Sequence, residues 1–370
     1  AVCGHGKGLY LWGKDSRPAY PGIGSTDNRA WRVTEQWYRD GTFERVYPQI
    51  CQRLLPCQQA ALLRWMKDTR PEVYRNIQFV FSAKDYIRFR LTGQAFSEAT
   101  DISGSGLMDV KNGRFCRDLL ESLGIGEVYD ALAPLRNSSD LCGQITDAAA
   151  SATGLRPGTP VAGGMFDVDA CAIASAVTRP GQICTITGTW SINEFISDRP
   201  ILGTAIAMNS LYAIPGYYLL EESSATSAGN LEWIIQNCID TKGLSGGALY
   251  DYLAELAQGV DPGDSEVYYL PFLYGSNAHP LAKACFVGMT SYHTTAHMVR
   301  AVYEGVTYSH RTHIDKLLTV AQKPECIRMA GGAVNSGFWV RMFADVLNCP
   351  IETVTGVKEL GALGCAMAAC

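Results

Sequence analysis

The run CIRMAGGAVNSGFWVRMFADVLNCPI, residues 326–351, constrains the fold more than any other part of the chain. A short apolar segment precedes two glycines, apolar side chains follow at helical spacing, and a second apolar segment ends the run, which predicts a strand, a tight turn, a helix and another strand. Gly331 and Gly332 allow a ligand close to the backbone, and the helix that begins near Ser336 presents free N–H groups there. The run contains neither a Walker A Gly-Lys-Ser/Thr nor a GxGxxG, so taken alone it is more often a structural turn than a ligand site.

Helices and strands alternate along the rest of the chain, which predicts an α/β fold. Apolar spacing and stop signals predict helices at 27–41 after an Asp/Asn cap, at 58–77 with a break before Pro71, at 82–93, after Asp167, and at 294–318. Strands are expected at Gly8–Trp12, at Pro160–Ala162 and twice within 181–197, and the turn Gly13–Asp15 has the pattern of a hairpin. The mostly helical pattern gives way to two β-rich runs near Val177–Gly181, which predicts two domains, residues 1–178 and 179–370.

Charge and composition exclude several classes of partner. The net charge is −5 and the pI about 5.7, which disfavours nucleic acid and anionic membrane surfaces. No apolar run reaches the roughly 18–20 residues that span a bilayer, so a cytoplasmic protein is expected. The 13 cysteines include no CxxC pair, and His310 and His313 lack the spacing of a zinc protease helix. We therefore expect reduced thiols, used as small core residues, and no protein-held metal.

Two further runs contain residue types that carry chemistry. AGGMFDVDAC, residues 162–171, places Asp167 and Asp169 among glycines and apolar residues, where either acid is an ordinary loop residue or a proton acceptor. In TITGTWS, Gly188 and Thr189 lie between two β runs. They form a plain hairpin turn, or they present N–H and hydroxyl donors to a phosphate.

Taken together, these runs resemble the FGGY family of carbohydrate kinases. The most specific match is ACFVGMTSYHTTAHMVRAVYE, residues 284–304, which reproduces the family's second signature through Gly288-Met289, His297-Met298 and Ala301–Glu304. GGMFD resembles the family's catalytic GGxHD-like run, with Phe166 in place of a common histidine. TGTW, AGGAVNSGFW and ELGALGCAMAA follow in the family's order, so that the resemblance covers essentially the whole chain.

Some positions depart from the family pattern. QAALLRWMKD keeps Trp65 of the first signature but has Leu62 where a lysine is usual. The runs GHGKGLYLWGKDSRP, STDNRAW and SSATSAGNLEWI are most similar to the L-xylulose kinase-like branch, whereas glycerol kinases have Arg-Glu at Gly6-Lys7. The phosphate hairpin with DxGT has no counterpart here, and an incomplete sequence is the explanation we favour. DISGSG, which begins at Asp101, offers an acid and glycines out of order and is expected to be a loop.

The resemblance implies a two-domain actin/hexokinase-like (ribonuclease H-like) fold with a cleft between the domains. It implies ATP and Mg²⁺ as cofactors, a ketopentose such as L-xylulose as substrate, and a homodimer. By position in GGxxD, Asp167 resembles the catalytic base and Asp169 does not. Even if Asp167 also caps the following helix, that is compatible with catalysis.

The family pattern also implies binding residues on both domains. Gly6, Lys7 and Asp27 would bind the sugar together with Asp167, although Lys7 could be a solvated charge and Asp27 a helix N-cap. The implied nucleotide-binding residues are Gly188, Thr189, Gly331, Gly332 and Asn335, with the first two at the phosphates and the others at the adenine.

Two alternatives remain open from the sequence. The chain is a kinase of the same family for another ketose or polyol, such as D-xylulose, ribulose, erythritol or glycerol, or it is a non-catalytic sugar-binding homologue. The retained Asp167 argues against the second alternative.

Overall fold

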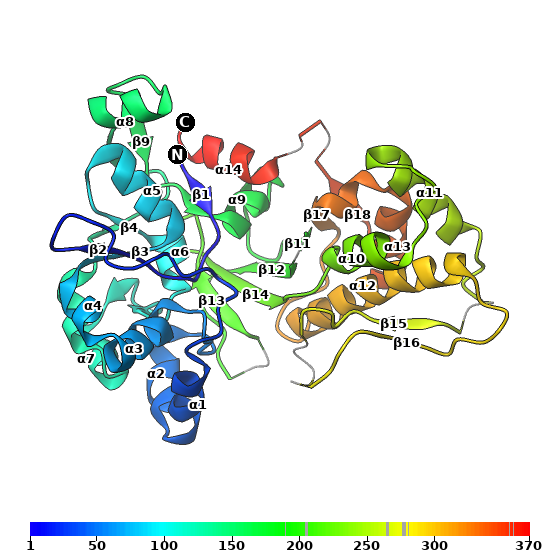
Figure 1. Cartoon of the computed structure of the whole chain (residues 1–370), viewed down its shortest axis with the longest axis horizontal. Coiled ribbons are helices and arrows are strands. Elements are labelled where there is room, and N and C mark those ends of the chain that lie inside the picture. The colour runs from blue at the N-terminus through cyan, green and yellow to red at the C-terminus, as the bar shows by residue number, and fades with distance from the viewer. Residues whose placement is uncertain are drawn as a thin grey trace. The chain divides into compact units, whose positions relative to one another are not determined.

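The computed structural model describes residues 1–188, 190–203, 206–263, 266–275, 279, 281–354, 356–357 and 359–370 (Figure 1). The chain forms two compact units. The first contains residues 1–180, 196–220 and 357–370, and the second contains residues 181–195 and 221–356. Strands β12 (Ser191–Ser197) and β14 (Tyr218–Ser224) therefore contribute residues to both units.

The first unit is mostly helical. Its helices are α1 (Trp31–Arg39), α2 (Thr42–Ile50), α3 (Gln59–Thr69), α4 (Pro71–Asn76), α5 (Ala83–Thr92), α6 (Ala99–Ser103), α7 (Arg117–Ser122), the 3-10 helix η1 (Gly126–Ala131), α8 (Asp147–Thr153), α9 (Asp167–Ala174) and α14 (Leu360–Ala368). Its short strands are β1 (Cys3–Gly4), β2 (Tyr10–Gly13), β3 (Ile77–Phe81), β4 (Ser97–Glu98), β5 (Met108–Asp109), β6 (Arg114–Phe115), β7 (Leu135–Arg136), β8 (Leu141–Gln144), β9 (Pro160–Ala162), β10 (Met165–Phe166) and β13 (Met208–Leu211).

The core of the first unit surrounds α3. Its first two turns bury Ala60 to Leu63 completely, and Met66 continues the buried face one turn later. Removing these side chains from water stabilises the helix by about 0.8 kcal/mol for each buried methylene group. The parallel pair β1–β10 and the antiparallel pair β2–β3 lie in the same unit.

Helix α9 packs closely against α14 in the first unit (Figure 1). The close approach depends on Gly364, because any Cβ there would collide with the backbone carbonyl of Ala170. Both helices are built largely from small residues, so their backbones can lie near one another. This packing fixes the helix that begins with Asp167.

The main sheet has the order β13-β14-β12-β11-β17-β18, and its last five strands contribute residues to the second unit. The remaining elements of the second unit are β11 (Ile183–Thr187), α10 (Gly229–Cys238), α11 (Gly246–Gln258), β15 (Tyr268–Leu270), β16 (Cys285–Val287), α12 (Thr295–Leu317), β17 (Ile327–Gly331), the 3-10 helix η2 (Gly332–Asn335), α13 (Gly337–Leu347) and β18 (Ile351–Thr353). β11 pairs antiparallel with β12 and parallel with β17, and β17 pairs parallel with β18. Helices α10, α11 and α13 pack against α12, the longest helix of the unit.

Several predicted elements are confirmed. The break before Pro71 separates α3 from α4, and α5 ends at Gly93, which has a φ of +72°. The strand, glycine turn, helix and strand of residues 326–351 are β17, η2, α13 and β18. The expectation that the cysteines are core residues holds for part of them, since six of the thirteen are buried, four are half-buried, and Cys238, Cys285 and Cys370 are exposed.

No helix in the described ranges combines the length and apolar character required to cross a membrane.

Two local predictions are wrong, and the hairpin is confirmed. The helix expected from Asp27 begins at Trp31 with Ala30 as its N-cap, and the Asp27 carboxylate pairs with Arg29. The hairpin at Gly13–Asp15 forms through antiparallel bridges that join Leu9 to Ile23 and Trp12 to Pro18, while the regular ladder of β2 runs to β3. DISGSG does not begin a loop, since Asp101 lies within α6 and is buried.

Candidate active site

A tight turn leads from β9 through β10 into α9, and Asp167 is the first residue of that helix. Gly164 has a φ of +76°, and a Cβ at either Gly163 or Gly164 would collide with a backbone carbonyl of a neighbouring segment. Glycine is therefore required at both positions. The N-cap of α9 is Phe166, so Asp167 does not cap the helix, and its side chain is half-buried. A carboxylate at a helix N-terminus is stabilised there by the helix dipole.

Asp169 differs from Asp167 in its environment. Its side chain is fully buried, and its Oδ1 accepts a hydrogen bond of 2.9 Å from the backbone N of Ala213. Its Oδ2 accepts no hydrogen bond from the residues that the structure describes. Burial, followed by the nearby Glu98, raises the pKa of Asp169 well above its usual range. Burial of Asp169 thus favours its protonated form.

Gly6 and Lys7 lie next to the turn that ends in Asp167. A Cβ at Gly6 would lie 2.6 Å from Cε2 of Phe166, so glycine is needed for the aromatic ring to pack there. Lys7 has a left-handed φ of +65°, and its side chain is half-buried. Strand β1 pairs with β10 through Gly4 and Phe166, so the ladder fixes this proximity.

Asp27 lies on the turn before α1 and is held by Arg29. The guanidinium Nε and Nη2 each donate a hydrogen bond of 2.8 Å to a different carboxylate oxygen. The Arg29 guanidinium also lies over the Trp65 ring, 5.1 Å from its centroid. The hydrogen bonds from Arg29 lower the pKa of Asp27, so the carboxylate stays ionised at neutral pH.

The Asp27 segment and the Lys7 turn are neighbours. Leu9 and Ile23 exchange both backbone hydrogen bonds, at 2.9 and 3.0 Å, and the backbone N of Asp27 donates to the carbonyl of Gly24. A Cβ at Gly8 would lie 2.5 Å from the carbonyl O of Ile23. The structure therefore brings the predicted sugar-binding residues Gly6, Lys7 and Asp27 to adjoining turns of the first unit.

A hollow of about 510 Å³ in the second unit contains most of the predicted nucleotide-binding residues. Gly188, Gly332 and Asn335 line it, together with side chains from α10, α11 and α12. A cavity of this size lies in the range that small-molecule ligands occupy. Thr189 lies outside the described residues.

Gly331 is not one of the residues that line this hollow, but it directly precedes Gly332, which does. Its φ of +92° and its place opposite Thr187 in the β11–β17 ladder leave no space for a side chain. The chain then turns into η2, where the Asn335 amide Nδ2 donates 3.1 Å to the carbonyl of Gly332. The amide oxygen of Asn335 is available as an acceptor, and the free N–H groups at the start of α13 favour polar or anionic groups.

Three polar side chains of the hollow have no obvious signal in the sequence. Glu232 of α10 accepts hydrogen bonds from Gln236, at 3.1 Å, and from the hydroxyl of Tyr250, at 2.9 Å. The buried hydroxyl of Tyr303 has no hydrogen-bond partner among the described residues. Glu232, Tyr250 and Tyr303 all line the hollow, which gives it hydroxyl and carboxylate groups that suit the hydroxyls and polar ring edges of a nucleotide.

The residues present fit a nucleotide better than they fit a metal held by the protein. The hollow combines glycine turns, a helix N-terminus and a side-chain amide. Within the described ranges, no group of three or more His, Cys, Asp or Glu residues is arranged to hold a metal ion.

Comparison with known proteins identifies the family. Residues 1–174 match the N-terminal domain of the FGGY family of carbohydrate kinases, and residues 184–370 match its C-terminal domain. The chain belongs to the FGGY family of carbohydrate kinases.

Relatives in this FGGY family include two proteins with more than 30% identity. The L-xylulose/3-keto-L-gulonate kinase of Escherichia coli (strain K12) is 36% identical over 369 residues, which cover 100% of this chain and 72% of that protein. A protein of Pasteurella multocida (strain Pm70) described as a probable L-xylulose kinase is 34% identical over 370 residues, and 74% of it is covered.

Solved structures show the same fold. The xylulose kinase from Rhodospirillum rubrum superposes with a TM-score of 0.84 at 26% identity, over 100% of this chain and 74% of that one. A ligand-bound xylulose kinase from Lactobacillus acidophilus gives a TM-score of 0.87 at 24% identity, over 99% and 74%. The FGGY kinase described here thus has the two-domain, actin-like α/β fold of these proteins, as the sequence predicted.

The second FGGY signature, residues 284–304, has structural roles in the second unit. Gly288 has a φ of +88°, and a Cβ there would collide with the carbonyl of Glu266. His297 forms a capping box at the start of α12, where its Nδ1 accepts from the backbone N of Thr294 at 3.2 Å. Ala301 and Tyr303 are buried in the core. The most specific motif of the sequence therefore shapes the turn at Gly288 and the start of α12, and it supplies Tyr303 to the hollow.

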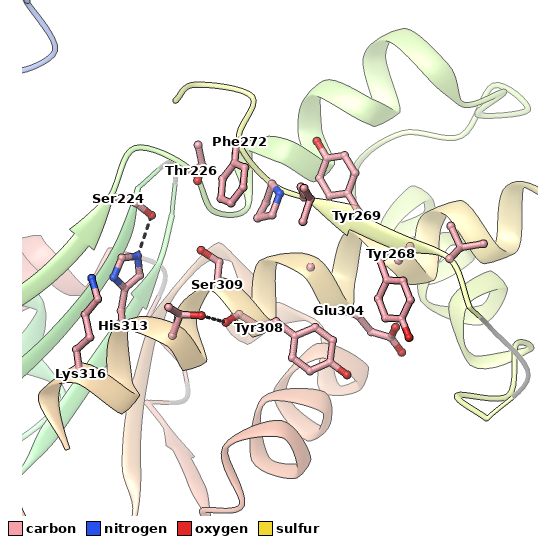
Figure 2. Close-up of a pocket in the computed structure, with 16 residues that line it drawn as sticks. Ser224, Thr226, Tyr268, Tyr269, Phe272, Glu304, Tyr308, Ser309, His313 and Lys316 are labelled. Carbon is pink, nitrogen blue, oxygen red and sulfur yellow. Dashed lines mark hydrogen bonds between the residues drawn. The ribbon is translucent and has the colours of Figure 1, made fainter. Parts of the chain in front are cut away.

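A second hollow, of about 450 Å³, lies between α12 and the segment that contains β15 (Figure 2). At one end, His313 Nε2 lies 3.1 Å from the hydroxyl of Ser224, while its Nδ1 lies 3.3 Å from Glu222 Oε2. Lys316 donates to the same Glu222 oxygen at 3.0 Å. Burial by itself would raise the pKa of Glu222, but hydrogen bonds from His313 and Lys316 lower it. These bonds join β14 to α12, and none of the predicted site residues lies in this hollow.

Proposed function

We propose that this FGGY kinase transfers the γ-phosphoryl group of ATP to a hydroxyl of a ketopentose such as L-xylulose. The observation that carries the proposal is the similarity of the whole of this chain to 72% of a kinase named for L-xylulose, at 36% identity. The name of that relative includes 3-keto-L-gulonate, which makes this sugar acid the second candidate substrate. Residues 1–178 would bind the sugar and residues 179–370 the nucleotide.

We propose Asp167 as the general base. A sugar hydroxyl is a poor nucleophile while protonated, so a carboxylate within hydrogen-bond reach must accept its proton as the hydroxyl oxygen attacks the γ-phosphorus. Asp167 is half-buried and begins α9 after a turn whose glycines exclude side chains. Asp169 is unsuited to this role, because it is fully buried and its pKa is raised.

The remaining predicted residues would bind the two substrates. Lys7 would donate from its left-handed turn to a sugar hydroxyl, and Gly6 would let the sugar approach the backbone beside Phe166. The Asp27 carboxylate, already oriented by Arg29, would accept from another hydroxyl.

On the nucleotide side, Gly188 and Thr189 would face the phosphates. Gly331 and Gly332 would bring the backbone close to the adenine, and Asn335 would hydrogen-bond the ring edge. The hollow that Gly188, Gly332 and Asn335 line supports this assignment.

A substrate panel tests the proposal. ADP release by the intact enzyme would be measured with L-xylulose, 3-keto-L-gulonate, D-xylulose, L-ribulose, erythritol and glycerol, each against a blank without sugar. We expect the highest kcat/KM with L-xylulose, at least about tenfold above D-xylulose, because a mispaired buried hydroxyl costs more than 1 kcal/mol. A higher kcat/KM with another sugar would make that sugar the assigned substrate. The absence of stimulated ADP release with any sugar would refute the kinase assignment.

The expected assembly and location rest on the family resemblance alone. We propose a cytoplasmic homodimer. Light scattering on the purified enzyme would give twice the mass of one chain, and cell fractionation would recover the activity in the soluble fraction. A single-chain mass or membrane-bound activity would contradict these proposals.

A further inference from the structure

Polar groups from distant segments hold the start of the turn that leads to Asp167. The backbone N of Gly163 donates 2.9 Å to the carbonyl of Asp140, and the N of Gly164 donates 3.0 Å to the carbonyl of Ser138. The carbonyl of Gly163 accepts from the buried guanidinium of Arg88. These three bonds fix the glycine pair but do not reach the residue before Asp167.

Thr100 of α6 holds the end of the turn. Its Oγ1 accepts a hydrogen bond of 3.0 Å from the backbone N of Phe166, the residue immediately before Asp167 and the N-cap of α9. Thr100 is 1% exposed, so water does not compete for this bond. The hydroxyl thereby sets where the backbone enters α9 and hence where the Asp167 side chain begins.

Glu98 fixes the direction of the Thr100 hydroxyl. That hydroxyl donates its single proton to Glu98 Oε2 at 2.7 Å, which leaves its lone pairs for Phe166. Glu98 also accepts from the backbone N of Thr100, at 3.0 Å, and from the hydroxyl of Ser138, at 2.9 Å. Ser138 supplies the carbonyl that Gly164 binds. One buried carboxylate therefore links both ends of the turn.

Lys84 forms a buried ion pair with this carboxylate. Its ammonium lies 3.1 Å from Glu98 Oε2 and 2.8 Å from Asp85 Oδ1, and all three side chains are buried. Burial alone would lower the pKa of Lys84, but the neighbouring carboxylates outweigh it and raise the pKa. Because the Lys84 ammonium can only donate, Glu98 Oε2 accepts from both Lys84 and the Thr100 hydroxyl, which gives the hydroxyl one orientation.

We propose that Thr100 is a positioning residue for Asp167, acting through the backbone of Phe166, with its hydroxyl oriented by Glu98. The inference rests on the proposed function, in which Asp167 is the general base. Without the bond to Phe166, the turn relaxes and Asp167 no longer meets the sugar hydroxyl at the geometry that proton transfer requires. A misplacement of about 1 Å at a reacting group costs up to roughly a hundredfold in rate.

The test compares two substitutions at Thr100 in the intact enzyme. Thr100→Val keeps the shape but removes the hydroxyl, and we expect kcat to fall about 10- to 100-fold with the KM for sugar within about threefold. Thr100→Ser retains the hydroxyl and is expected to keep kcat within about threefold of the wild type. The matched control is Thr92→Val, since Thr92 is also buried in this unit and its hydroxyl donates 3.0 Å to the carbonyl of Arg88.

The outcomes separate positioning from stability. A similar loss of thermal stability in Thr100→Val and Thr92→Val, with a loss of kcat in the first alone, supports the proposal. If the folded Thr100→Val enzyme keeps kcat within threefold, or if Thr100→Ser is as impaired as Thr100→Val, the proposal is wrong. If Thr100→Val does not fold, Thr100→Ser and the pH dependence of its kcat decide. A shift of more than one pH unit in the acidic limb of that profile would show that the serine hydroxyl does not restore the position of Asp167, and the proposal would be wrong.

A double substitution distinguishes failure of this inference from failure of the proposed function. If Thr100 acts through Asp167, Thr100→Val is expected to cause no further loss of kcat in the Asp167→Asn background. If Asp167→Asn alone retains full kcat, the general base has been misassigned. If both single variants lose kcat and the losses multiply, Asp167 keeps its role and the positioning role of Thr100 is refuted.

Discussion

Replacing Gly331 by alanine is expected to destabilise the second unit, because both the backbone conformation and the space require glycine. Gly331 has a φ of +92° and a ψ of −175°, a region essentially restricted to glycine, where another residue costs about 1–3 kcal/mol. A Cβ would also lie 2.5 Å from the carbonyl O of Thr187, its partner across β11 and β17. Relieving that contact separates the strands locally, at about 1 kcal/mol for each ladder hydrogen bond weakened. Gly331→Ala should therefore lower the free energy of unfolding by about 2–4 kcal/mol.

Gly332→Ala is the matched control for this prediction. A Cβ at Gly332 would meet no atom within 4 Å, so the free energy of unfolding should stay within about 1 kcal/mol of the wild type. The added methyl group would instead occupy open space in the hollow of about 510 Å³ that Gly332 lines and that we propose binds the nucleotide, and it should weaken ADP binding.

Urea denaturation followed by tryptophan fluorescence would measure the first effect, and calorimetric titration with ADP the second. The two variants are expected to separate, with Gly331→Ala losing stability and Gly332→Ala losing affinity. Equal stability of Gly331→Ala and the wild type, within about 0.5 kcal/mol, would refute the argument from backbone conformation and space.

Two buried carboxylates of the first unit give further predictions. Burial raises the pKa of Asp101 to about 8, so the folded state retains a proton that the unfolded state has lost, and the free energy of unfolding should fall as pH rises from about 4 to 8. Asp101→Asn should flatten this fall in urea denaturation at pH 5.5, 7.0 and 8.5, and an unchanged slope would contradict the assignment. In Glu98→Gln, the amide cannot accept all the hydrogen bonds that Glu98 receives, and the Lys84 ammonium loses one of its carboxylate partners. Thermal denaturation should therefore show a free energy of unfolding lower by about 3–5 kcal/mol. A decrease below about 1 kcal/mol would contradict the role of this hydrogen-bond network.

The sequence predicts those elements whose signals are local. The helix expected at 294–318 is α12, the break at Pro71 separates two helices, and Gly93 ends α5 in a left-handed conformation. Each depends on apolar spacing or on the backbone restrictions of proline and glycine, which neighbouring residues reveal. The glycine turn before α13 is recognisable for the same reason.

Elements that depend on distant partners are not predicted. Asp101 was expected in a loop, yet α6 forms because Glu98 caps it through the backbone N–H groups of Thr100 and Asp101, and Glu98 is itself fixed by Lys84. Strand β2 pairs locally through isolated bridges, as expected, but its regular ladder is formed with β3, which lies far along the chain. Tertiary contacts decide whether such a helix forms and which strands pair, and the local sequence carries no pattern for these contacts.

The candidate site likewise contains residues that a local sequence signal predicts and residues that only tertiary contacts bring to it. Gly163, Gly164 and Asp167 form a short run whose turn is predictable from its glycines. Thr100 and Glu98 act on that turn from another part of the first unit, so only the folded chain shows their contribution. In the hollow of about 510 Å³ in the second unit, Glu232 and Tyr250 likewise meet only through the packing of α10 and α11.

Single-turnover phosphoryl transfer by Asp167→Asn tests the central claim most directly. The intact enzyme would be mixed with limiting ATP and saturating L-xylulose, and Asp147→Asn would serve as the control, because Asp147 is likewise the first residue of a helix in this unit but is exposed. We expect the transfer rate of Asp167→Asn to fall at least about a hundredfold, with the Kd for L-xylulose within about threefold, because general base catalysis contributes about 10²–10⁴-fold. Asp147→Asn should match the wild type. An Asp167→Asn enzyme that transfers phosphate within threefold of the wild-type rate would contradict the assignment of Asp167 as the base.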